Sequence, residues 1–210
     1  MGTRNLGSRL VNFEALSPDR SILATRGPDN TVILRDLTGP PRSLGPPLSG
    51  HRNSVNSLAF STDGNILATG DSDGTMFLWD LTDRNQPRSL GQLPSGHRDL
   101  VNSMALDPDG NTLATAGNDG TVILWDLTFP ARPRRLGQPL AHGSSVHSVA
   151  FSPDGNTLGT GSSDAAVLLW DLTGLNQLRS LAPERACSIA GRGLNDDEDE
   201  WALRCFKWVT

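Results

Sequence analysis

Three histidines of this sequence recur with a threonine, an aspartate and a tryptophan at constant spacing. Each histidine lies 22 residues before an aspartate, which itself lies four residues after a threonine and six before a tryptophan. These side chains are the types that a nucleophilic active site uses. One active site does not recur three times at fixed register, so we interpret the sets as structural. The three sets are His51, Thr69, Asp73 and Trp79; His97, Thr115, Asp119 and Trp125; and His142, Thr160, Asp164 and Trp170.

Other candidate chemical groups lack the partners that a metal or cofactor site needs. The turns Asp71–Gly74 and Asp107–Gly110 are rich in aspartate but lack the remaining ligands of a calcium loop. The two cysteines, Cys187 and Cys205, are too few for a zinc site or a disulfide framework. The acidic run 196–200 suits the first turn of a helix. We therefore expect no catalytic residue, no metal and no cofactor.

Composition narrows the class of protein. Of the 210 residues, 36% are apolar and 20% are charged, which is typical of a globular chain. The longest apolar run, Ala165–Trp170, is far shorter than the roughly 20 residues that a spanning helix needs. The first residues contain no secretory or myristoylation signal, so we expect a cytoplasmic protein that does not bind membranes. The net charge of −5 argues against nucleic acid as a partner.

An internal repeat positions these residues. Two kinds of string recur at intervals of 46 and 45 residues, and a degenerate copy precedes them. Each unit predicts four short strands joined by turns, which in the unit 55–90 are Val55–Phe60, Ile66–Gly70, Thr75–Leu81 and Arg88–Leu90. A four-stranded unit repeated about every 45 residues selects a β-propeller among all-β folds. The recurring strings are Val55–Phe60, Val101–Leu106 and Val146–Phe151, and Leu78–Thr82, Leu124–Thr128 and Leu169–Thr173.

The repeat resembles the WD40 family. The motifs that carry the resemblance are the histidines that open three units, preceded by Gly50, Gly96 and Ala141, and the Trp-Asp pairs at 79–80, 125–126 and 170–171. The resemblance implies an all-β propeller of four blades over residues 4–182. It also implies that each His, Thr, Asp and Trp set forms a buried hydrogen-bond chain, here called a tetrad, and that the protein binds other proteins or peptides.

The two ends of the chain depart from the pattern. The first unit has Gly7 in place of the histidine and Arg35 in place of the tryptophan, as expected of a degenerate end repeat. Residues 183–210 predict a short helical tail, with Trp201 and Trp208 on one helix face. The tail resembles the segment that closes many bacterial WD40 proteins, often behind a kinase or nucleotide-binding signalling domain. This chain would then be the C-terminal part of a larger WD40 protein.

Two groups of residues are candidates for binding a partner. The first group flanks the tetrads in loops, where a rigid scaffold carries recognition residues. The second is a set of arginines on the predicted outer strands, whose charge would grip an acidic partner or protect an exposed strand edge. The loop candidates are Pro28, Arg52, Asn53, Ser72, Arg98, Asp99, Leu100, Asn118 and Ser163, and the outer arginines are Arg4, Arg42, Arg88, Arg134 and Arg179.

Three functions remain open at this stage. The first is a non-catalytic interaction scaffold, the second the sensor or regulatory end of a larger signalling kinase or ATPase, and the third a propeller hydrolase. Four blades span only part of an ordinary seven-blade ring, so we expect an open arc. Blade faces lined by residues such as Val32, Leu34, Leu168 and Trp170 would then lie uncovered and favour self-association.

Overall fold

The structure is a computed structural model that describes residues 14–94 and 96–175. These residues form four antiparallel sheets, which we call blades one to four. Blade one contains β1 (Glu14–Leu16), β2 (Ile22–Arg26), β3 (Val32–Asp36) and β4 (Arg42–Ser43). Blade two contains β5 (Val55–Phe60), β6 (Ile66–Asp71), β7 (Met76–Asp80) and β8 (Arg88–Gln92).

Blades three and four follow the same order of strands. Blade three contains β9 (Val101–Leu106), β10 (Thr112–Gly117), β11 (Thr121–Asp126) and β12 (Arg134–Arg135), and the short β13 (Leu140–Ala141) also pairs with β11. Blade four contains β14 (Val146–Phe151), β15 (Thr157–Ser162) and β16 (Val167–Asp171). Its fourth strand, predicted at Arg179–Leu181, lies outside the described residues, as do the degenerate motif at Gly7 and the tail 183–210.

Local turn chemistry sets the hairpins. In blade two the Ser61 hydroxyl donates to the Asp63 carboxylate and also accepts the backbone N–H of Ile66. Gly64 completes this turn with a φ of 72°, a backbone conformation that costs glycine little. The Ser152 turn of blade four repeats the arrangement with Asp154 and Gly155. These turns fix the register in which the first and second strand of a blade pair.

Three apolar clusters hold neighbouring blades together. In each cluster the second and third strands of one blade contribute small and aliphatic side chains, and the next blade contributes its tryptophan strand and the valine of its first strand. Between blades two and three, for example, Met76 and Leu78 pack with Trp125 and Val101. We call the side of a blade that turns to the following blade its forward face, and the opposite side its backward face.

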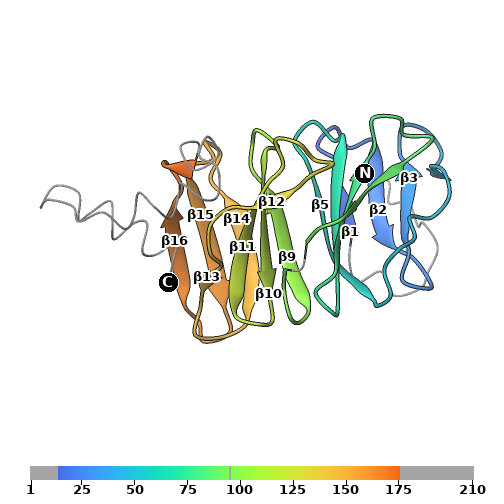
Figure 1. Ribbon diagram of the computed structural model, residues 1–210. Helices are drawn as coiled ribbons and strands as arrows, with labels where there is room; N and C mark the ends of the chain where they lie inside the picture. The colour runs from blue at the N-terminus through green and yellow to red at the C-terminus, as the bar shows by residue number, and fades with distance from the viewer. Residues whose placement is uncertain (1–13, 95, 176–210) are drawn as a thin grey trace, which may run out of the picture.

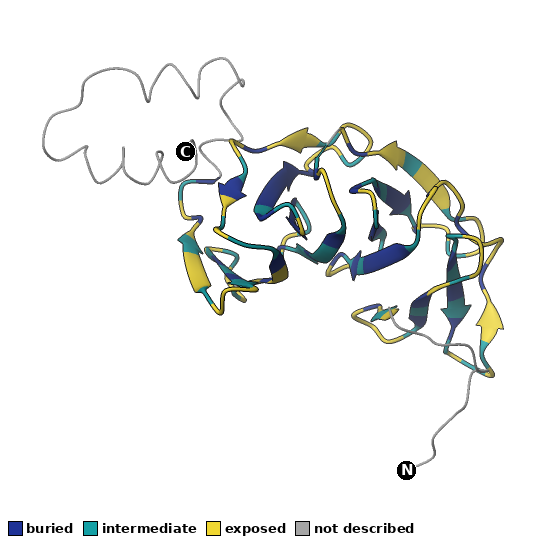
Figure 2. Cartoon of the chain, turned by 90° about the horizontal axis from the view of Figure 1, so that it is seen from below, coloured by how far each residue is buried: buried dark blue, intermediate teal, exposed yellow. Residues whose placement is uncertain are grey.

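The blades follow one another along an open arc. The first strands β1, β5, β9 and β14 lie in sequence along its inner side, where each contacts the next. Figures 1 and 2 place blades one and four at opposite ends, and the most buried strands belong to the two central blades. The backward face of blade one and the forward face of blade four therefore have no neighbouring blade among the described residues.

The structure supports the all-β propeller-like architecture and changes one detail. Val32 and Leu34, expected to line an uncovered face, are buried against blade two, and Trp170, expected to line the other, is half-buried against blade three. Val32 and Leu34 lie on the forward face of blade one, and the side chains that alternate with them, such as Ile33, lie on the open side. Among the described residues, no helix is long and apolar enough to cross a membrane.

Candidate interaction face

The candidate interaction face is the side of the arc where each second strand turns into the third. The strands are antiparallel, so the links that lead into the first strand of a blade reach the same side. We call this side the loop face. It comprises residues 27–31, 49–54, 71–75, 96–100, 117–121, 141–145 and 162–166. All three histidines of the tetrads lie in or beside these loops.

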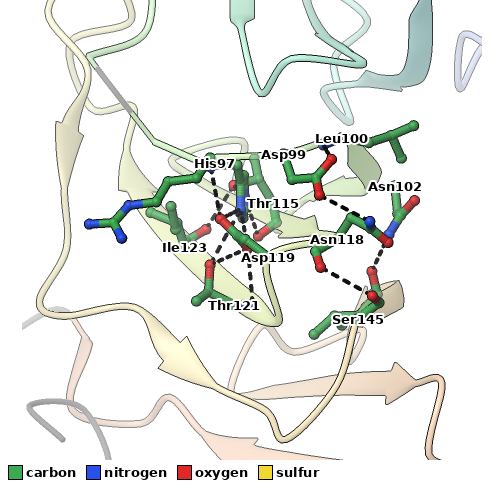
Figure 3. Close-up of polar contacts among 12 residues, drawn as sticks. His97, Asp99, Leu100, Asn102, Thr115, Asn118, Asp119, Thr121, Ile123 and Ser145 are labelled. Atoms are coloured by element: carbon green, nitrogen blue, oxygen red, sulfur yellow. Dashed lines mark hydrogen bonds and ion pairs between the residues drawn. The ribbon is translucent and has the colours of Figure 1, made fainter.

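Blade three has the tetrad geometry that the spacing predicts. The His97 Nε2 lies 2.9 Å from the Thr115 hydroxyl, and the Trp125 indole N–H donates to the same hydroxyl at 3.1 Å. The His97 Nδ1 lies 3.1 Å from the Asp119 carboxylate (Figure 3). Asp119 also accepts the backbone N–H of Arg98 at 3.0 Å. The carboxylate thus joins two loops of one blade.

The Thr115 hydroxyl is the centre of the hydrogen-bond chain in blade three. An indole N–H is only a donor, so the Thr115 oxygen accepts from Trp125. The Thr115 hydroxyl also donates to the backbone carbonyl of Ile123 at 3.3 Å, and the His97 Nε2 lies 3.1 Å from the backbone carbonyl of Thr115. Each buried polar group of this hydrogen-bond chain therefore has a partner, which is the condition for a buried polar network to stabilise the fold.

Blade two uses a different carboxylate, and the assignment of Asp73 to its tetrad is wrong. His51 lies with Nε2 2.7 Å from the Thr69 hydroxyl and with Nδ1 2.6 Å from Asp71, two residues earlier in the chain. Trp79 donates to Thr69 at 3.0 Å, as Trp125 does to Thr115. Asp73 instead accepts from the Asn53 amide at 2.8 Å, on the surface.

The position of Asp71 explains why the two blades differ. The repeat aligns Asp71 with Gly117 of blade three and with Ser162 of blade four. A Cβ placed at Gly117 would lie 2.4 Å from the His97 Nδ1 and 2.8 Å from the Asp119 carboxylate. Blade three therefore needs glycine there to let Asp119 reach the histidine. Blade two fills the same space with the carboxylate itself.

Blade four has a looser version of the tetrad. The Thr160 hydroxyl lies 2.9 Å from the His142 Nε2 and accepts the Trp170 indole N–H at 2.9 Å. Asp164 accepts from the Ser162 hydroxyl and from the backbone N–H of Ala166, which ties it to its own turn. Burial lowers the pKa of His142, and the nearby Asp164 charge only partly offsets this effect. Blade four thus retains the tetrad residues without the close His–Asp contact.

The two close aspartates have opposite pKa shifts. Burial raises the pKa of Asp71 above its ordinary value, because the hydrogen bond from His51 only partly offsets burial and the Asp73 carboxylate adds to the rise. Burial also acts on Asp119, but the hydrogen bonds from His97, the Arg98 backbone and Thr121 outweigh it and lower the pKa of Asp119. The described residues contain no cluster of three or more His, Cys, Asp or Glu side chains that could hold a metal.

The loop candidates are placed together on the loop face, and most are exposed. Ser72 and Leu100 are half-buried. Several are held by hydrogen bonds within the face: Asn53 donates to Asp73, Asn118 to Asp99, and Ser163 lies 2.6 Å from the His147 Nε2. The exposed candidates are Pro28, Arg52, Asn53, Arg98, Asp99, Asn118 and Ser163.

Hydrogen bonds between blades also hold the loop face, and the repeat pattern did not predict them. The Asn30 amide of blade one donates to the backbone carbonyl of Arg52 in blade two at 2.8 Å. The Ser145 hydroxyl donates to the carbonyl of Asn118, and the Asn102 amide donates to the carbonyl of Val146 (Figure 3). The spacing of the repeat does not show which polar side chains reach across to a neighbouring blade, and Asn30 has no polar equivalent in the other blades.

Arginines behave differently on the two sides of a blade. On the outer strands, Arg42 and Arg134 form ion pairs with Asp36 and Asp126 of the adjacent strand, each at 2.9 Å. Carboxylates of the same blade therefore neutralise the charges of Arg42 and Arg134. On the loop face, no carboxylate of the described chain lies within ion-pair distance of Arg52 or Arg98. Arg4 and Arg179 lie outside the described residues.

Comparison with known proteins agrees with this architecture. The family model described as "WD domain, G-beta repeat" matches residues 43–80, 88–126 and 134–171, together more than half of the chain. Each match begins in or at the fourth strand of one blade and ends with the third strand of the next. No curated protein matches the chain. WD40 repeats generally mediate protein binding and are typically non-catalytic. This chain belongs to the WD40 repeat family.

Proposed function

We propose that this protein is a non-catalytic interaction scaffold that binds a protein or peptide partner on its loop face. The observation that carries the proposal is the combination of exposed side chains and a fixed backbone on that face. Loops on a rigid framework present recognition residues with little loss of conformational freedom on binding. Here the tetrads and the hydrogen bonds between blades hold the loops in place.

Arg52 and Arg98 are the charged anchors that we propose for this partner. They occupy the same position in blades two and three, directly after the tetrad histidines. Both are exposed and neither forms an ion pair within the described chain, so their binding capacity remains for another molecule. Arginine at the centre of an interface is a frequent source of binding energy. A partner that bears carboxylates suits these two groups.

Capture of partners from the native lysate tests this proposal. The full chain serves as bait beside the double variant Arg52→Glu/Arg98→Glu, with Arg132→Glu as the matched control. Arg132 is exposed and lies in the link between β11 and β12, on the other side of the blade. We expect the control to retain a protein that the double variant loses. Equal capture by all three baits would contradict binding through the loop face.

Two further parts of the proposal concern context. The open end faces of the arc favour self-association, because each exposes apolar side chains that neighbouring blades cover elsewhere. The alternative function, the regulatory end of a larger bacterial signalling kinase or ATPase in the cytoplasm, draws its support from the predicted tail. A longer reading frame with a catalytic domain upstream would favour that alternative over a separate scaffold.

A further inference from the structure

The forward face of blade four is the largest departure from the repeat. Val167 is 74% exposed and Leu169 is 75% exposed. The residues at the same positions of the three other blades are at most 2% exposed, because the next blade covers them. These residues are Val32 and Leu34, Met76 and Leu78, and Val122 and Leu124. Blade four thus presents the apolar face that every other blade buries.

The surface that fits this face is the backward face of another blade. Within the chain, each forward face packs on the same set of positions of the following blade, and this interface forms three times. Within residues 14–94 and 96–175, one backward face is uncovered, that of blade one. Leu23, Ile33 and Leu37 lie there, at the positions that Leu113, Ile123 and Leu127 fill in blade three, and Arg35 takes the place of Trp125. Each of these four side chains of blade one is only half-buried.

Blade four has space for the first strand of a neighbouring blade. A Cβ at Gly70 of blade two would lie 2.8 Å from the side chain of Val101, the first-strand valine of the next blade. Blade three carries the small residue Ala116 at this position, and Val146 is buried in the same cluster. Blade four carries Gly161, around which nothing lies within 4 Å of an added Cβ. Blade one differs from the other three blades, because it carries the large residue Arg26 at this position, with its side chain exposed.

We propose that a second copy of this chain covers the face, with its blade one docked on blade four of the first. The contact is head-to-tail, and the second copy's blade four meets blade one of the first copy, so that two chains close one ring. The ring has eight blades, within the range of four to eight that propellers adopt. The inference rests on the self-association within the proposed function and specifies its geometry.

The mass of the intact chain in solution tests the proposal, with one blocking variant for each face. Gly161→Trp fills the open space on blade four, where the free chain has room for it. Ile33→Arg replaces an apolar side chain on the open face of blade one with a second cation beside Arg35. Gly39→Trp is the matched control, since nothing lies within 4 Å of its added Cβ either and it sits in the link after β3, away from both faces. Circular dichroism confirms that each variant is folded.

We expect light scattering on a size-exclusion column to give twice the 22.4 kDa chain mass for the wild type and for Gly39→Trp. Each blocking variant alone should run as one chain, and their equimolar mixture should recover a two-chain species through its one unblocked interface. A dimer of Ile33→Arg alone would overturn the head-to-tail contact, as would growth beyond two chains.

The outcomes separate this inference from the proposed function. A wild-type monomer at every concentration overturns both the ring and self-association, and it leaves partner capture by the loop face to be judged by its own experiment. A wild-type dimer that Gly161→Trp does not affect supports self-association and overturns the contact proposed here.

Discussion

Blades two and three bury the same histidine in the same place and hold it with carboxylates from different positions. In blade two the partner is Asp71, at the end of β6, and in blade three it is Asp119, in the turn beyond β10. The exchange is possible because the residue at one position is Asp in the first case and Gly in the second. Repeats of one family thus conserve an interaction while the residue that provides it moves.

The shared part of the two tetrads is the tryptophan, and its removal should have the largest effect. Trp125 is fully buried and donates to Thr115. Trp125→Ala leaves a cavity and removes one hydrogen bond to Thr115, so we expect a loss of about 3–5 kcal/mol in the free energy of unfolding. Arg35→Ala is the control at the same position of blade one, where the side chain is half-buried and no tetrad histidine precedes it. Equal melting shifts for the two variants would contradict the tetrad assignment.

A substitution at Gly117 tests why blade three uses Asp119 where blade two uses Asp71. Gly117→Ala places a methyl group 2.4 Å from the His97 Nδ1, and the His–Asp contact must open to admit it. We expect a loss of about 1–3 kcal/mol, the usual cost of overpacking a well-filled site. Urea unfolding measures the change. Gly161→Ala is the matched control in blade four, where the new methyl group meets no atom within 4 Å, and its stability should change by less than about 0.5 kcal/mol.

A large effect of Gly161→Ala would contradict the spatial explanation for Gly117, because both substitutions add one methyl group near the end of a second strand and only the one at Gly117 meets close neighbours. A small effect of Gly117→Ala would show that Asp119 does not need the glycine.

The opposite pKa shifts of the two aspartates predict opposite responses to acid. The pKa of Asp119 is lowered from 3.8, so its contribution is present above pH 3.8 and is lost as the pH falls below that value. The pKa of Asp71 is raised from 3.8, so Asp71 ionises less readily in the folded protein than in the unfolded chain. The folded protein therefore loses stability as the pH rises above 3.8 and Asp71 ionises.

Melting temperatures of Asp119→Asn and Asp71→Asn between pH 2 and 7 measure these responses. We expect Asp119→Asn to lower stability at pH 7 by about 1–2 kcal/mol, since a charged hydrogen-bond partner of His97 is lost. Its stability should also fall less steeply below pH 4 than that of the wild type. Asp71→Asn should lose stability below pH 4 as steeply as the wild type does. Between pH 4 and 7 it should lose less stability than the wild type. Identical pH profiles for the two variants would refute the contrast.

The sequence predicted the repeated sheets because hairpin turns and alternating apolar strands are local patterns. It predicted the tetrad of blade three correctly in geometry, since equal spacing was enough there. The sequence analysis placed Asp73 in the tetrad of blade two because Asp73, like Asp119 in blade three, lies 22 residues after the histidine. Which of two nearby carboxylates reaches a buried imidazole depends on the direction of each side chain from its strand or turn. Asp71 leaves β6 on the side of His51, whereas Asp73 lies in the exposed turn.

The distinction between open and buried faces was also beyond a local pattern. Strand β3 alternates apolar side chains on both faces, so its sequence does not tell which face meets a neighbour. Val32 and Leu34 are buried only because blade two follows, and Val167 and Leu169 are exposed only because the described chain supplies no blade after the fourth. Burial in a repeat array depends on the order of the blades.

The smallest predicted effect extends the comparison to blade four, at the residue that closes its turn. Blades two and three have Gly74 and Gly120 there, with φ of 84° and 77°, whereas blade four has Ala165 with a φ of 62°. An L-residue with a side chain is strained in this region, at a cost of roughly 1–2 kcal/mol, and glycine is not. Glycine also loses more backbone freedom on folding, which offsets part of the gain. We therefore expect Ala165→Gly to raise the free energy of unfolding by at most about 1 kcal/mol, as measured in urea.

The control is Ala166→Gly, at the next position, which has no positive φ to relieve and should be destabilised. A loss of stability in Ala165→Gly equal to that of the control would mean that backbone strain in this turn does not distinguish blade four from its neighbours.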